Sequence, residues 1–269
     1  MSTTGRHDEA PEGAAVELLA AALGPRARGC FTTRGAGASR LPAPADERYT
    51  GLNLAAHVDD DPAHVAACRA WLEEAVGLGD GDIAWMNQVH SDVVARAERG
   101  SAPRADALVL DARAEQAGFR PLRGAGVLVA DCVPLLLASA DGLLVAAVHA
   151  GRRGMLGGVV ARAVEEMASL GADPAGMSAA IGPSICGRCY EVPESMRDEA
   201  AAIEPACAAT TSWGTPGLDV AAGVIAQLQR CGVGRIAPSQ WCTFEDERFF
   251  SYRREGATGR LAGIVLTTI

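Results

Sequence analysis

Two apolar runs between residues 127 and 149 dominate the pattern of the chain. Both are apolar on both faces, as is typical of strands buried in the middle of a sheet. Asp141-Gly142 lies between them and favours a tight hairpin turn, because both residue types tolerate a positive φ. In such a hairpin the numbers of directly opposed residues sum to about 283, so His149 lies opposite Pro134. Cys132 is two residues before Pro134 and shares the face of His149, and we expect the chemistry of the protein there.

Shorter patterns place the other elements. Further strands are predicted over residues 30–34, 83–86, 93–95, 107–110, 177–181, 249–252 and 261–267. Helices are predicted from Asp60 or Asp61 to Gly77 and over residues 155–170, 193–203 and 218–231. An apolar run over residues 14–23 predicts a flexible N-terminal tail with a short helix in residues 1–27, before a single catalytic domain over residues 28–269. Strands and helices mix without regular βαβ alternation, so the fold class is α+β. We expect a single layered domain of mixed β-sheets covered by helices, with a cysteine-hydrolase-like architecture.

Composition narrows the functional classes. The net charge of −9 argues against a general nucleic-acid binder or a protein of acidic membrane surfaces. No segment is long enough to span a membrane, and acidic residues before the first apolar run argue against a signal peptide. The eight cysteines are scattered, and several lie inside apolar runs, which predicts free thiols and a reducing cytoplasm.

The histidines differ in context. The chain has five: His7, His57, His64, His90 and His149. His7 lies in the tail, His64 is expected to be solvated on the first helix, and His57 either lines a pocket or only precedes that helix. His90 and His149 follow apolar strands and, with Cys132, form a ligand set that zinc accepts while keeping a fourth position open.

The same residues allow two other interpretations. His149 could activate Cys132 as a thiolate nucleophile without any metal. Cys132 could also be an inert core thiol, although the adjacent Asp131 would be costly in an apolar core.

Glycines, arginines and a CxxC suggest further sites. Gly151-Arg152-Arg153-Gly154 follows His149 and opens a helix, where backbone amides and guanidinium groups favour an anion. Arg34, at a strand end, and the SYRREG run over residues 251–256 are candidates of the same kind. The lone Cys186-Gly187-Arg188-Cys189 lacks a second knuckle, which Cys207, Cys231 and Cys242 do not supply, so we expect a pocket-side loop with free thiols.

Seven segments together resemble one family. They are FTTRGAG (31–37), GLNLAAHVDDDPAHV (51–65), WMNQVHS (85–91), ADCVPLLL (130–137), VHAGRRG (148–154), IGPSICGRCYEV (181–192) and SYRREGATGR (251–260). Over residues 28–268 the chain resembles the laccase-domain or polyphenol-oxidase-like family, whose members are described as purine nucleoside phosphorylases with adenosine deaminase side activity.

The resemblance implies zinc on His90, Cys132 and His149, and phosphorolysis of adenosine, inosine and methylthioadenosine. Arg34, Asn53 and Arg153 are then the candidates for contacts with a purine nucleoside or phosphate. Two positions depart from the family pattern: Arg152 stands where Trp is common, and the SICGRCYEV segment leaves Cys189 as the matching cysteine. With five histidines and no His-x-His pair, the sequence does not carry a laccase-type copper cluster. A metal-free cysteine hydrolase or amidase and a non-catalytic scaffold remain the alternatives.

Overall fold

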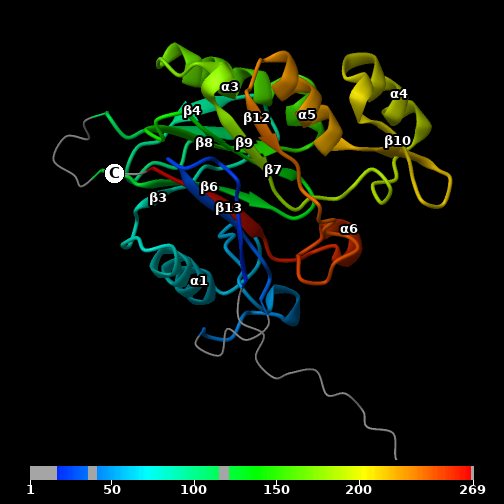
Figure 1. The fold of residues 1–269 in the computed structure, drawn as a ribbon. Helices are drawn as coiled ribbons and strands as arrows, with labels where there is room; N and C mark the ends of the chain where they lie inside the picture. The colour runs from blue at the N-terminus through cyan, green and yellow to red at the C-terminus, as the bar shows by residue number, and fades with distance from the viewer. Residues whose placement is uncertain (1–16, 36–40, 115–120, 268–269) are drawn as a thin grey trace, which may run out of the picture.

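Two β-sheets lie face to face between layers of helices (Figure 1). The structure is a computed structural model, and it describes residues 17–35, 41–114 and 121–267. The six-stranded sheet has the order β12 (Arg235–Ala237), β9 (Ser178–Ile181), β7 (Val133–Ala138), β8 (Leu144–Ala150), β5 (Ala107–Asp111) and β4 (Val94–Arg96). The five-stranded sheet has the order β1 (Leu18–Ala20), β2 (Arg28–Thr32), β13 (Leu261–Leu266), β6 (Gly124–Val129) and β3 (Ile83–Ala84). Both sheets mix parallel and antiparallel pairs, as an α+β fold predicts.

The helices cover the two outer faces of this sandwich. α2 (Arg152–Gly157), α3 (Val159–Ser169) and α5 (Val220–Arg230) pack on the six-stranded sheet, and α1 (Pro62–Ala75) packs on the five-stranded sheet (Figure 1). α4 (Glu194–Ile203) lies beside the small hairpin of β10 (Ala208–Thr210) and β11 (Pro216–Leu218), and α6 (Tyr252–Glu255) is a single turn. Three 3-10 turns, Glu47–Tyr49, Pro174–Gly176 and Pro205–Cys207, complete the described elements. In the described ranges no helix is long and apolar enough to cross a membrane.

The central hairpin has the predicted register. β7 and β8 are buried along their whole length, and Pro134 pairs with His149. The turn is longer than predicted, because Ser139 and Leu144 are the last residues that bond across the ladder and residues 140–143 form the loop. Of Asp141 and Gly142, only Gly142 has a positive φ, at 73°. The register is unchanged because the longer loop keeps the same midpoint.

The prediction of a helix near the N-terminus is wrong for the residues that the structure describes. Leu18–Ala20 is a strand, antiparallel to β2, and Leu19 and Leu23 are buried in the core between the sheets. Pairing with β2 and burial against the second sheet outweigh local helix preference. The part of the predicted helix before residue 17 lies outside the described residues.

Two later elements also differ from prediction. The strand predicted over residues 249–252 is absent: Phe249 and Phe250 are both fully buried without a β-partner, and Ser251 caps α6. The helix predicted over 155–170 is broken at Gly158, whose φ of 91° separates α2 from α3.

The close contact between Phe31 on β2 and Gly182 after β9 makes the packing of the two sheets testable. A Cβ at Gly182, directly after β9, would lie 2.3 Å from Cδ1 of Phe31. We expect Gly182→Ala to lower the free energy of unfolding by about 1–3 kcal/mol, because a buried ring must move. Chemical denaturation measures this, with the exposed helical Gly157→Ala as a control within about 0.5 kcal/mol of wild type. An unchanged stability of Gly182→Ala would show that the ring has room to move.

Candidate functional site

The two central strands and one loop bring Cys132, His149 and His90 together. Cys132 directly precedes β7, His149 lies near the end of β8, and His90 comes from the loop between β3 and β4. One ligand atom from each residue lies within 4.8 Å of the others, and Cys132 Sγ is 3.8 Å from His90 Nε2. The two imidazoles meet edge to face, with centroids 4.7 Å apart. The predicted face-sharing of Cys132 and His149 is therefore confirmed.

A buried carboxylate that sequence reasoning missed orients two of these residues. Asp106 Oδ1 is 2.7 Å from His149 Nδ1 and accepts the backbone N–H of His90 at 2.9 Å. Its Oδ2 accepts the N–H and the hydroxyl of Ser91 at 2.6 and 2.7 Å. Burial alone would raise the pKa of Asp106, but these bonds hold it well below its usual value. One sequence signal could have identified Asp106: it comes directly before the apolar strand β5, and a carboxylate buried there needs hydrogen-bond partners.

The backbone around the ligands is strained and close-packed. His90 and Asp131 have φ values of 58° and 89°, in the region that non-glycine residues rarely adopt. A Cβ at Gly151 would lie 3.0 Å from His90 Cδ2 and 3.1 Å from Cys132 Sγ. Glycine at this position therefore lets the three side chains approach one another.

Cys132 and His149 titrate as a pair. Burial alone would raise the pKa of the Cys132 thiol, but the charge and hydrogen bond of His149, with help from His90, lower it to about 6. Burial alone would lower the pKa of His149, but the Cys132 thiolate and Asp106 raise it to about 9. The site therefore favours a thiolate, which is the form that binds a metal or acts as a nucleophile.

The three residues lie in the wall of a cavity of about 720 Å³. This volume is in the range of small-molecule sites. The rest of the lining includes three arginines and two tyrosines that sequence reasoning had not assigned to one place: Arg152, Arg253, Arg260, Tyr190 and Tyr252. His57 also lines the cavity, which decides between its two predicted settings. The cavity thus combines a metal-ligating wall with cationic and aromatic groups.

Of the predicted substrate-binding residues, Asn53 lies in the core and forms hydrogen bonds with neighbouring residues. It is fully buried, and its Nδ2 donates to Asp60 Oδ2 at 2.7 Å. Its Oδ1 accepts the backbone N–H of Arg260 at 3.0 Å. Asp60 also contacts His64 Nδ1 at 2.8 Å, so the prediction that His64 is solvated is wrong: His64 lies on the buried side of α1, and Asp60 is its polar partner there.

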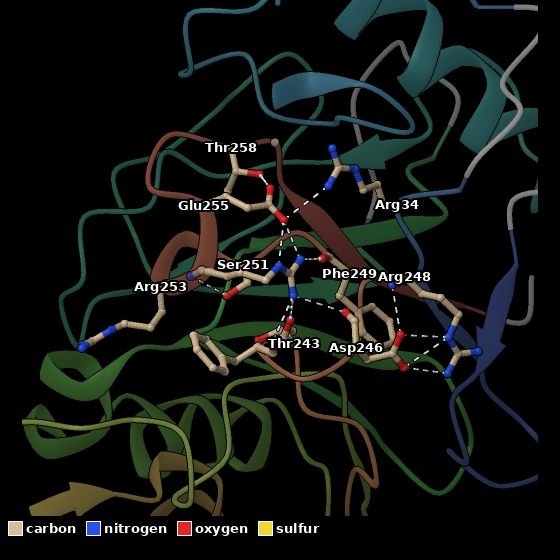
Figure 2. Close-up of polar contacts among 12 residues, drawn as sticks. Arg34, Thr243, Asp246, Arg248, Phe249, Ser251, Arg253, Glu255 and Thr258 are labelled. Atoms are coloured by element: carbon tan, nitrogen blue, oxygen red, sulfur yellow. Dashed lines mark hydrogen bonds and ion pairs between the residues drawn. The ribbon is translucent and has the colours of Figure 1, made fainter. Parts of the chain in front are cut away.

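Arg34 belongs to a polar network beside the cavity (Figure 2). Its Nη1 lies 3.3 Å from Glu255 Oε1, and its guanidinium stacks on Phe250 at 4.8 Å. The same carboxylate binds Arg254, whose guanidinium donates to the carbonyls of Thr243 and Phe249, each at 2.6 Å. Arg34 is outside the cavity lining, and so is Arg153, which is exposed on α2. The network fixes the loop that presents Tyr252 and Arg253.

Similar proteins share most of the chain. A sequence model of the family described as multi-copper polyphenol oxidoreductase laccase matches residues 28–268. A purine nucleoside phosphorylase of Streptomyces coelicolor is 49% identical over 239 residues, which are 87% of this chain and 93% of that protein. One from Mycobacterium bovis is 45% identical over 240 residues, 89% and 92% of the two chains. The crystal structure of Neisseria meningitidis protein NMB0706, of the DUF152 family, superimposes with a TM-score of 0.77 at 33% identity. The match covers 93% of this chain and 98% of that one. On the extent of these matches, the chain belongs to the multi-copper polyphenol oxidoreductase laccase family, whose similar members include proteins named purine nucleoside phosphorylase.

Proposed function

We propose that the protein is a zinc-dependent purine nucleoside phosphorylase acting on adenosine, inosine and methylthioadenosine, with an adenosine deaminase side activity. The observation that carries the proposal is the His90–Cys132–His149 set in the wall of a cavity that also contains three arginines and two tyrosines. The relatives named purine nucleoside phosphorylase support the same reaction class. We propose that residues 28–269 form one catalytic domain, to which β1 adds an edge strand, that its architecture is cysteine-hydrolase-like, and that it works in the cytoplasm, where thiolate ligands stay reduced.

The donor set fits zinc. Two imidazoles and one thiolate are ligands that zinc prefers, and three protein ligands leave a position open for substrate or water. Asp106 behind His149 is the carboxylate partner that orients metal-ligating histidines. A bound zinc ion would supply Lewis-acid polarisation or a water of lowered pKa, and the second of these would serve the proposed adenosine deaminase side activity.

The arginines and tyrosines are assigned to the two substrates. Arg152, Arg253 and Arg260 provide positive charge for phosphate, whose oxygen would attack the ribose carbon as the bond to the purine breaks. The rings of Tyr190 and Tyr252 offer stacking faces for the base. Among the earlier candidates, Asn53 and Arg34 would position Arg260 and the cavity loop, and exposed Arg153 would attract phosphate toward the cavity.

One alternative also has a specific observation in its favour. Cys132, His149 and Asp106 follow the order of a nucleophile, a base and an orienting carboxylate. A metal-free cysteine hydrolase or amidase would use these residues alone. No feature of the described residues favours the non-catalytic scaffold.

Substitution of Cys132 separates these two functions. In Cys132→Ala we expect zinc content at this site to be lost and adenosine phosphorolysis to fall by at least about a hundredfold, since a direct ligand is removed. Elemental analysis and release of ribose 1-phosphate measure this, and Cys231→Ala, at the end of α5, is the control with wild-type values. The hydrolase would be established instead if wild-type protein contained no metal, had hydrolytic activity, and lost that activity when a thiol reagent bound Cys132.

Arg152 tests how the cavity divides between phosphate and base. We expect Arg152→Trp to raise the KM for phosphate several-fold and lower the KM for adenosine, because a cation is exchanged for a stacking surface. Initial rates with each substrate varied in turn give both constants. Arg153→Trp, on the same helix but outside the lining, should change both less. Equal effects of the two substitutions would remove Arg152 from the substrate site.

Asn53 tests positioning against direct contact. Asn53→Ala should lower the free energy of unfolding by about 1–3 kcal/mol, because Asp60 and the Arg260 amide lose a buried partner. Thermal and chemical denaturation measure this loss, and the exposed Asn87→Ala provides the matched control. A variant of wild-type stability with a raised KM would identify Asn53 as a substrate contact instead.

A further inference from the structure

Three cysteines and a glutamate meet outside the His90–Cys132–His149 set. Single ligand atoms of Cys186, Cys189, Cys242 and Glu245 all lie within 4.8 Å of one another. The first two belong to the CxxC turn, and the other two come from the segment that leads into the Arg254 network. The sequence spacing did not connect Cys242 with the CxxC, but the fold brings the two together.

Backbone bonds hold the two halves together. Ser184 pairs with Cys242 in an isolated bridge, and Thr243 N–H donates to Ser184 O at 3.1 Å. The amide of Cys186 donates to Cys242 Sγ at 3.4 Å, and the amides of Cys189 and Tyr190 close the turn on Cys186 O, both at 3.0 Å. An amide directed at sulfur stabilises the thiolate form that a metal requires. The arrangement is thus preorganised around sulfur.

The cluster is partly buried: Cys189 and Cys242 lie inside, Cys186 is half-buried, and Glu245 is exposed beside a cation. Cys189 and Cys242 are 4% and 8% exposed, in a small apolar cluster with Ile185. Arg188, inside the CxxC turn, lies 3.3 Å from Glu245 Oε2 and would offset part of the negative charge of the ligands.

We propose that Cys186, Cys189, Cys242 and Glu245 form a second metal site, which binds one structural zinc ion. Thiolates select zinc over the oxygen-preferring magnesium and calcium, and four protein ligands close the coordination sphere, as in structural sites. Ligands at about 2.3 Å from a tetrahedral zinc ion lie about 3.8 Å from one another, so the cluster would contract by up to about 1 Å on binding.

The position of the site gives it a structural purpose. Ile185 and Tyr190 flank the CxxC and line the cavity, and Tyr252 and Arg253 follow the second half and line the same cavity. Arg253 bridges the two segments, because its Nη1 donates to Glu191 O at 3.1 Å and its guanidinium lies over the Tyr190 ring. A metal at the cluster would join the two loops that form this wall.

Metal counting on the whole protein tests the proposal. Native mass spectrometry of freshly purified protein should show two zinc ions per chain in wild type, one in Cys132→Ser, one in Cys242→Ser and none in the double variant. Cys231→Ser, whose thiol belongs to neither set, is the control and should retain two. Equal zinc in wild type and Cys242→Ser would overturn the second site, whatever happens at Cys132.

A second measurement covers the case in which Cys242→Ser does not fold. Cys132→Ser loaded with Co²⁺ should keep an intense thiolate-to-cobalt absorption, because the three-cysteine set is intact in that variant. Glu245→Gln, which keeps all thiols, should lose zinc to a chelator about tenfold faster than wild type. No thiolate-to-cobalt absorption in folded Cys132→Ser would contradict the site. So would a disulfide between two of the three cysteines, detected by mass after alkylation without reductant.

Discussion

The contact between Asp106 and His149 is the interaction on which the site depends. One buried carboxylate accepts a hydrogen bond from the imidazole and further hydrogen bonds from the backbone amides of the loop that carries His90. Burying a carboxylate is costly unless its oxygens are bonded, and here several donors converge on it. The same bonds orient His149, hold His90 in its strained conformation, and favour the Cys132 thiolate. Removing the carboxylate would therefore affect the orientation of His149, the conformation of His90, and the stability of the Cys132 thiolate.

The sandwich supplies the rigidity that this strain requires. β7 and β8 are buried on both faces, one against helices and the other against the second sheet. A one-residue slip would exchange the side chains packed on the helices with those packed on the second sheet and would disrupt both close-packed layers, so the positions of Cys132 and His149 at the end of the hairpin are determined closely. Positive φ values at His90 and Asp131 persist because the surroundings leave no alternative.

The other wall of the cavity is built from loops and depends on polar contacts. Arg254 satisfies carbonyls along the loop from Thr243 to Phe249, and Asp131 accepts the hydroxyl of Thr243 and the amide of Arg253. Asp131 therefore links the start of the central hairpin to the loop that presents Tyr252. Loops without a hydrophobic core need such bonds, and the cysteine cluster next to them would add another constraint.

The amino-acid pattern was sufficient to predict the central hairpin, its register, and the shared face of Cys132 and His149. These follow from local rules: alternation of side chains along a strand, apolar content on both faces, and the midpoint of a turn. Three contacts became visible only in the folded chain: Asp106 orients His149, Asn53 supports Arg260, and Cys242 meets the CxxC turn. Each of these contacts joins segments far apart in the chain, and no local pattern encodes such a distance. The N-terminal apolar run shows the same limit: its composition favoured a helix, but pairing with β2 and burial between the sheets made residues 18–20 a strand.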